Sequence, residues 1–180
     1  MKNENLITLS NQLKSITASR PNSAILLAAG IVTSQQSVSI KIGNELEKWW
    51  NSIIKTLDTS ATHRQVDFFA EIGGTKYYFE FKCNTDLDSE KSKATLAKIQ
   101  EVKENLKADV AEVFNPVVTK DYFCSKLRRN IVGVESLIQL FNLEFTAEEY
   151  QKTWVDAVRE LFNIQDNNAK TNSEVSGRER

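Results

Sequence analysis

The segment RQVDFFAEIGGTKYYFEFKC, residues 64–83, decides the fold of this 180-residue chain. Over residues 64–72, and again over residues 75–83, apolar and polar side chains alternate with the period of two that is typical of β-strands. Gly73 and Gly74 separate the two runs, and glycines suit a two-residue hairpin turn because both turn positions take positive φ. The segment therefore predicts an antiparallel β-hairpin.

The predicted hairpin brings three charged side chains together. With the two glycines as the turn, Asp67 faces Glu80, and facing residues have Cβ atoms about 5 Å apart. Lys82 lies two residues beyond Glu80 and therefore projects from the same face. Two facing carboxylates repel, and a divalent cation with oxygen ligands would offset that repulsion. Mg²⁺ fits, because it accepts two carboxylates and leaves its other positions to water and phosphate.

The alternative interpretation is a surface hairpin with one Glu–Lys pair and an unrelated aspartate. Aromatic side chains alternate on both sides of the strands, so the hairpin is predicted to be buried on both faces, where charged residues are unusual. These aromatic residues are Phe69, Tyr77, Tyr78, Phe79 and Phe81. We therefore interpret the charged residues as functional, with Lys82 placed to orient an attacking water or to stabilise developing charge.

Residues 66–67 (VD) and 77–82 (YYFEFK) together resemble the PD-(D/E)xK motif, the metal-dependent core of type II restriction endonucleases and their relatives. Val66 stands where the motif has proline, a position that varies in the family. The resemblance covers about residues 40–110. It implies that Asp67 and Glu80 bind Mg²⁺, for which Mn²⁺ can substitute, and that Lys82 assists the nucleophilic water.

The family often carries a further acidic metal ligand on a helix before the hairpin. A helix from about residue 38 or 41 to 57 is predicted here, with a wide apolar stripe that includes Trp49. On a helical wheel Glu45 lies about 40° from Trp49, at the edge of the stripe, whereas Glu47 points well away. Glu45 is therefore the expected additional catalytic and metal-binding residue. The alternative is a solvated glutamate at the helix edge.

Candidate DNA contacts are spread along the second half of the chain. Residues 83–91, which include Asn84 and Lys91, resemble the segment after the motif in many type II restriction enzymes. A basic run at residues 120–129 contributes Lys126, Arg128 and Arg129. The alternatives are a solvated basic turn for this run and an exposed helix face for Lys91, Lys93 and Lys98. The lone histidine, His63, is interpreted as a surface residue or a phosphate contact.

The rest of the chain reads mainly as helices around this hairpin. Leu6, Leu9, Leu13 and Ile16 predict an N-terminal helix, and Ser23 can cap a short apolar one. Further helices are expected at 89–107, 134–141 and 146–162, a strand at 110–118, and a short strand or turn at 121–124. The fold class is therefore α/β: a restriction-endonuclease-like core in which a small mixed sheet, with the hairpin at its centre, is flanked by helices on both faces. Residues 1–164 are expected to form a single domain, followed by a disordered polar tail at 165–180.

Charge and length bear on the partners. The chain has 23 basic and 24 acidic residues and a formal net charge of −1, which argues against DNA binding by bulk positive charge alone. No helix-turn-helix or zinc module is visible to read a DNA sequence. We therefore expect double-stranded DNA to be cut either by a homodimer or by this chain as the strand-cutting small subunit of a heterodimer whose larger subunit recognises the DNA.

Localisation is indicated by two further features. Cys83 and Cys124 are too few and too far apart for a disulfide framework, which indicates reduced thiols in an intracellular protein. The resemblance to restriction endonucleases implies a prokaryotic cytoplasm. No apolar run is long enough to span a membrane. Two other functions stay open at this point. One is a repair or recombination nuclease acting on branched, mismatched or free-ended DNA, and the other is a non-enzymatic binding module.

Overall fold

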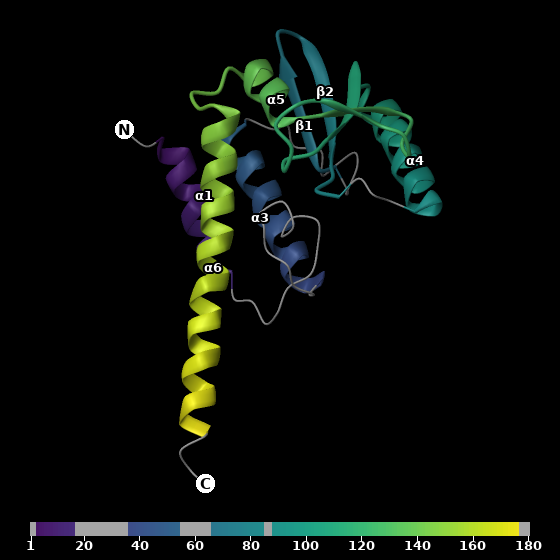
Figure 1. Cartoon of the computed structure of the whole chain (residues 1–180). Coiled ribbons are helices and arrows are strands. Elements are labelled where there is room, and N and C mark those ends of the chain that lie inside the picture. The colour runs from purple at the N-terminus through teal and green to yellow at the C-terminus, as the bar shows by residue number, and fades with distance from the viewer. Residues whose placement is uncertain (1–2, 17–35, 55–65, 85–87, 177–180) are drawn as a thin grey trace.

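The structure, a computed structural model, describes residues 3–16, 36–54, 66–84 and 88–176 (Figure 1). Its helices are α1 (Glu4–Lys14), α3 (Gln36–Ile53), α4 (Ser89–Leu106), α5 (Val134–Phe141) and α6 (Ala147–Ser176). Its strands are β1 (Phe68–Ile72), β2 (Thr75–Phe81), β3 (Val110–Phe114), β4 (Tyr122–Cys124) and β5 (Arg129–Val132). The predicted α/β class is confirmed. The helix expected after Ser23 and the position of His63 lie outside the described residues.

The hairpin has the register that its sequence predicts. Phe68 pairs with Phe79 and Ile72 pairs with Thr75, so the facing positions continue outward to Asp67 and Glu80. Gly73 and Gly74 form the turn with φ angles of +57° and +83°. Since side chains other than glycine are strained in this region, the two glycines fix both the turn and the register.

The hairpin lies at one side of the sheet and not at its centre, which corrects the sequence-based expectation. The sheet has five strands in the order β1-β2-β3-β5-β4. The β1–β2 and β4–β5 pairs are antiparallel, whereas β2–β3 and β3–β5 are parallel. The hairpin is not central because β5, a strand that the sequence analysis missed, pairs with β3, and β4 pairs with β5 at the far edge. All strands outside the hairpin therefore extend from the β2 side.

Helices cover both faces of the sheet, as expected (Figure 1). On one face Phe79, Phe81 and Phe114 pack into a core shared with α1, α3, α5 and α6. Trp49, Trp50 and Trp154 are fully buried there, and Trp50 donates a hydrogen bond to the Tyr150 hydroxyl at 3.1 Å. On the other face Tyr78, Val113 and Ile131 pack with Ile99 and Val102 of α4. In the described part of the chain, no helix has the length and apolar character needed to cross a membrane.

Two helix starts match their sequence signals. The Asp88 side chain caps α4 by accepting a hydrogen bond from the Lys91 N–H at 2.8 Å. Thr146 and Glu149, with the spacing typical of a capping box, form reciprocal hydrogen bonds at the start of α6. The end of α6 differs from the expected end at residue 162, because the helix continues to Ser176. Extending an existing helix costs far less than nucleating one, so a polar sequence can prolong a helix whose first turns are packed.

Candidate active site

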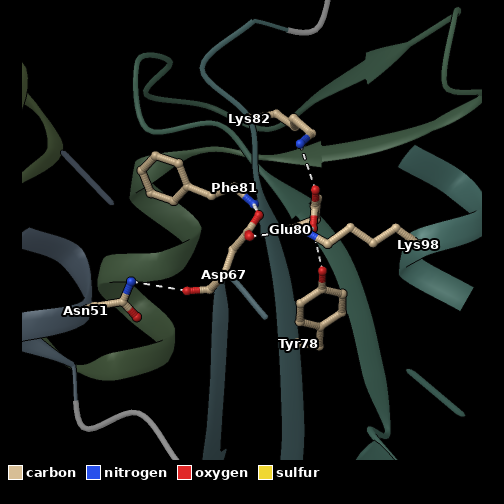
Figure 2. A network of polar contacts seen from close by, with 7 residues as sticks. All are labelled: Asn51, Asp67, Tyr78, Glu80, Phe81, Lys82 and Lys98. Atoms are coloured by element: carbon tan, nitrogen blue, oxygen red, sulfur yellow. Dashed lines mark hydrogen bonds and ion pairs between the residues drawn. The ribbon is translucent and has the colours of Figure 1, made fainter. Parts of the chain in front are cut away.

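The centre of the candidate site is Asp67, the residue immediately before β1. One carboxylate oxygen, Oδ2, accepts a hydrogen bond from the Phe81 backbone N–H at 3.0 Å across the hairpin. The Asp67 main-chain carbonyl accepts a bond of 3.1 Å from the Asn51 side chain of α3 (Figure 2). The hairpin and α3 therefore both fix the position of this aspartate.

Glu80 lies opposite, on β2, and its side chain is only 1% exposed. Its Oε1 lies 2.7 Å from Lys82 Nζ, and its Oε2 lies 2.7 Å from Lys98 Nζ. The buried Tyr78 hydroxyl also donates a hydrogen bond to Oε2 (Figure 2). The predicted grouping of Asp67, Glu80 and Lys82 on one face of the hairpin is therefore confirmed. A carboxylate this deeply buried is tolerated because both of its oxygens have charged partners.

Lys98 is a site residue that the sequence analysis placed on an exposed helix face, and that placement was wrong. Its side chain is 26% exposed, and Nζ lies 3.1 Å from Asp67 Oδ1 as well as 2.7 Å from Glu80 Oε2. A signal was present in the helix periodicity. Residue 98 lies three positions after Thr95 and four before Val102, and both of these are buried.

The two carboxylates have opposite pKa shifts. Burial by itself raises the pKa of Glu80, but the hydrogen bonds from two ammonium groups and a phenol outweigh burial and lower the pKa below its usual value. Burial and then the negative charge of Glu80 raise the pKa of Asp67, and its contacts with Lys98 and Phe81 offset only part of that rise. Glu80 is thus the firmly ionised member of the pair, and Asp67 carries the unfavourable charge.

The acidic residue of α3 that interacts electrostatically with the site residues is Glu47, whereas the sequence predicted Glu45. Burial raises the pKa of Glu47, and the charge of Asp67 raises it further. Asn51, one turn along α3, bonds both the Glu47 carbonyl at 3.0 Å and the Asp67 carbonyl. Glu45 instead pairs with Lys48 at 2.7 Å. A helical wheel shows the two flanks of an apolar stripe but not which flank meets the hairpin, and this choice depends on how α3 packs.

The donor set suits a hard cation. Within the described ranges no group of three or more His, Cys, Asp or Glu side chains is close enough to hold a metal ion together. Asp67 and Glu80 alone supply carboxylate oxygens, which matches the one or two protein carboxylates with which Mg²⁺ is usually held. Burial and then the negative charge of Glu80 raise the pKa of Asp67, and a divalent cation beside the pair would favour the ionised form. The residues therefore fit Mg²⁺.

The candidate DNA contacts fall into two groups. Asn84, just after β2, and Lys91, in the first turn of α4, are exposed on the segments that lead from Glu80 and Lys82 into α4. Lys91 also pairs with Asp88 at 3.1 Å. Lys126 and Arg128 precede β5, which is parallel to β3 and thus to β2. Lys126 and Arg128 therefore lie at the edge of the sheet where β2 begins, whereas Glu80 and Lys82 lie at the opposite edge, where β2 ends.

Arg129 is engaged within the fold, which weighs against the DNA contact predicted for it. Its guanidinium bonds the Glu112 carboxylate at 2.8 Å and the Ala111 carbonyl at 2.6 Å. These bonds join β5 to β3 and hold two neighbouring parallel strands together. The sequence shows a basic run over residues 120–129 but cannot show which of its charges are used in this way.

Comparisons of the chain with family models, with curated proteins and with solved structures find no match.

Proposed function

We propose that this protein is a Mg²⁺-dependent endonuclease that hydrolyses phosphodiester bonds of double-stranded DNA, in the manner of a type II restriction endonuclease or of its strand-cutting small subunit. The observation that carries the proposal is the convergence of Asp67, Glu80 and Lys82 on one face of the hairpin, where Lys98 contacts both carboxylates. The resemblance of residues 66–67 and 77–82 to the PD-(D/E)xK motif supports the same activity.

The position of the site in the sheet also supports an enzyme. Glu80 and Lys82 lie where β2 ends, and β2 is parallel to β3 and β5 beyond it. In open α/β sheets, ligands generally bind outside the carboxyl ends of the parallel strands. A phosphate group approaching this end of β2 would therefore meet the candidate site.

Each residue has a role that its contacts support. Asp67 and Glu80 would hold Mg²⁺, which when bound polarises a phosphoryl oxygen and lowers the pKa of bound water. Lys82 keeps one ammonium contact to Glu80 at 2.7 Å, while its side chain is 30% exposed and can donate to a water or to a phosphate oxygen. In the proposed reaction a water oriented by Lys82 attacks phosphorus in line, the bond from phosphorus to the 3′ oxygen breaks, and the products are a 5′-phosphate and a 3′-hydroxyl. Tyr78 keeps Glu80 in place, since burial and the neighbouring carboxylate raise the pKa of its hydroxyl and preserve it as a donor.

The proposal is tested by cleavage of supercoiled plasmid and of short linear duplexes in Mg²⁺ or Mn²⁺, together with calorimetric titration of the two ions. Wild-type protein should bind the ions and nick or cut the DNA. Lys82→Met should bind the ions but cut about 100-fold or more slowly, because only the charge next to the reacting group is lost. Lys93→Met, the same change at an exposed position of α4, is the control.

The quaternary arrangement is tested separately by gel filtration and by cleavage with this chain alone. Specific double-strand cutting without a partner would exclude an obligate larger subunit, whereas metal binding with only nicking would favour the small-subunit arrangement. Failure of the wild-type protein to bind either ion would contradict the proposed function.

A further inference from the structure

Lys98 connects the two carboxylates of the candidate site. Its Nζ lies 3.1 Å from Asp67 Oδ1 and 2.7 Å from Glu80 Oε2, so a single ammonium group contacts both (Figure 2). Lys82 approaches Glu80 through the other oxygen, Oε1. The three partners come from separate parts of the fold: the segment before β1, strand β2 and helix α4. Lys98 therefore links Asp67 to Glu80, a connection that the hairpin residues alone do not make.

Lys98 lies in a partly buried position, where the charge of a lysine must be compensated by nearby negative charges. It lies on the side of α4 that carries the buried Thr95, Ile99 and Val102, where an apolar side chain would pack without loss of hydration. Removing an ammonium group from water is unfavourable unless nearby opposite charges compensate. The compensation here comes from Asp67 and Glu80, which in turn would repel each other without a cation between them.

We propose that Lys98 is a positioning residue that acts as an internal counter-cation: it holds Asp67 and Glu80 together when no metal is bound and competes with a divalent cation for the same oxygens. The inference rests on the proposed function only in taking Asp67 and Glu80 as the metal site. One consequence is that the two carboxylates are already in place before a metal arrives. The other is that the protein binds the metal more weakly than the carboxylates alone would.

The first test is the affinity for Mg²⁺ and Ca²⁺, measured by calorimetry without DNA. Lys98→Met and Lys98→Gln both remove the positive charge, and Lys98→Gln keeps a hydrogen-bond donor. Each variant should bind the ions about tenfold or more tightly than wild type, because a positive charge next to the cation has been removed. Lys93→Met, on the exposed side of the same helix, should bind as wild type does.

The second test is thermal unfolding with and without metal. In EDTA, Lys98→Met should unfold about 5 °C or more below Lys93→Met, because the buried carboxylates lose a counter-charge. In saturating Mg²⁺ the difference should shrink to near zero, since the ion then supplies the charge that lysine supplied. A variant that folds only when Mg²⁺ is added would show the same exchange in an extreme form.

These measurements separate Lys98 from a merely structural residue. Unchanged or weaker affinity in folded Lys98→Met and Lys98→Gln would overturn the inference, as would a stability deficit that Mg²⁺ does not reduce. If the variants bind the ions more tightly but neither they nor wild type cut DNA, the proposed function fails while the role of Lys98 stands. If wild type binds and cuts but the Lys98 variants bind no better, only the inference fails. If neither wild type nor the Lys98 variants bind the ions, both the proposed function and the inference fail.

Discussion

Asp67 and Glu80 face each other across the β1–β2 hairpin and share the ammonium of Lys98, yet their environments shift their pKa values in opposite directions. Glu80 is more buried but has an ion pair at each of its oxygens, whereas the charge of Asp67 is only partly compensated. Such asymmetry between neighbouring carboxylates is common at functional sites, where a ligand completes the charge balance. It has measurable consequences for stability.

Replacing Asp67 should stabilise the metal-free protein. In Asp67→Asn the side chain keeps an oxygen that can accept from the Phe81 N–H but no longer carries the charge that burial and Glu80 disfavour. We expect a higher melting temperature than wild type in EDTA at pH 7, and no further rise on adding Mg²⁺. Asp109→Asn is the control, because Asp109 accepts an exposed backbone bond from Lys76 outside the site. A lower melting temperature in Asp67→Asn would show that the carboxylate is net stabilising.

Replacing Glu80 should have the opposite effect. Glu80→Gln leaves Lys82 and Lys98 without their main partner, and removing one member of a buried ion pair costs about 3 kcal/mol or more. Urea denaturation at pH 7 without metal measures the loss. Glu112→Gln breaks the more exposed pair with Arg129 on the same sheet and should cost no more than about 1 kcal/mol. Equal losses in the two variants would refute the claim that Glu80 is special.

The pH dependence of stability is set by the same shifts. The pKa of Asp67 in the folded protein is raised from the usual 3.8. Asp67 therefore contributes to the stability of the folded state below pH 3.8, and this contribution is lost as the pH rises through the raised pKa of the folded state. The advantage of Asp67→Asn over wild type should therefore be absent near pH 3 and reach its full size at neutral pH. The measurement is the difference in unfolding free energy between the two proteins in EDTA across this range.

Glu80 should give the reverse profile. Its folded pKa is lowered from the usual 4.5, so its contribution is present above that value and disappears as the pH falls through the lowered folded pKa. The deficit of Glu80→Gln should thus be largest at neutral pH and fade in acid. A deficit that is independent of pH would mean that shape and not charge explains the effect of Glu80.

Glu47 and Glu45 provide a matched pair on one helix. Glu47→Gln should weaken Mg²⁺ binding or cleavage about tenfold, as changes close to metal ligands typically do, since it removes negative charge next to Asp67. Glu45→Gln breaks only the pair with Lys48 and should leave both properties unchanged. Calorimetric titration with Mg²⁺ measures the binding, and plasmid cleavage measures the activity. Greater sensitivity at Glu45 would restore the sequence-based assignment.

Local signals in the sequence determined the hairpin, its register and the meeting of Asp67, Glu80 and Lys82. A two-residue glycine turn fixes which residues face each other, and a period of two fixes which of them share a face, so no distant part of the chain is needed. The α4 cap at Asp88 and the capping box at Thr146 were readable for the same reason.

Only the tertiary structure decided which groups approach this hairpin from elsewhere. The packing of α3 decides that Glu47, and not Glu45, interacts with the charges of the site. The packing of α4 places Lys98, expected at the surface, between the two carboxylates. The hairpin came to the side of the sheet because β5 added next to β3. Periodicity defines the faces of each element, but the pairing of those faces depends on contacts between residues far apart in the chain, which spacing along the sequence does not encode.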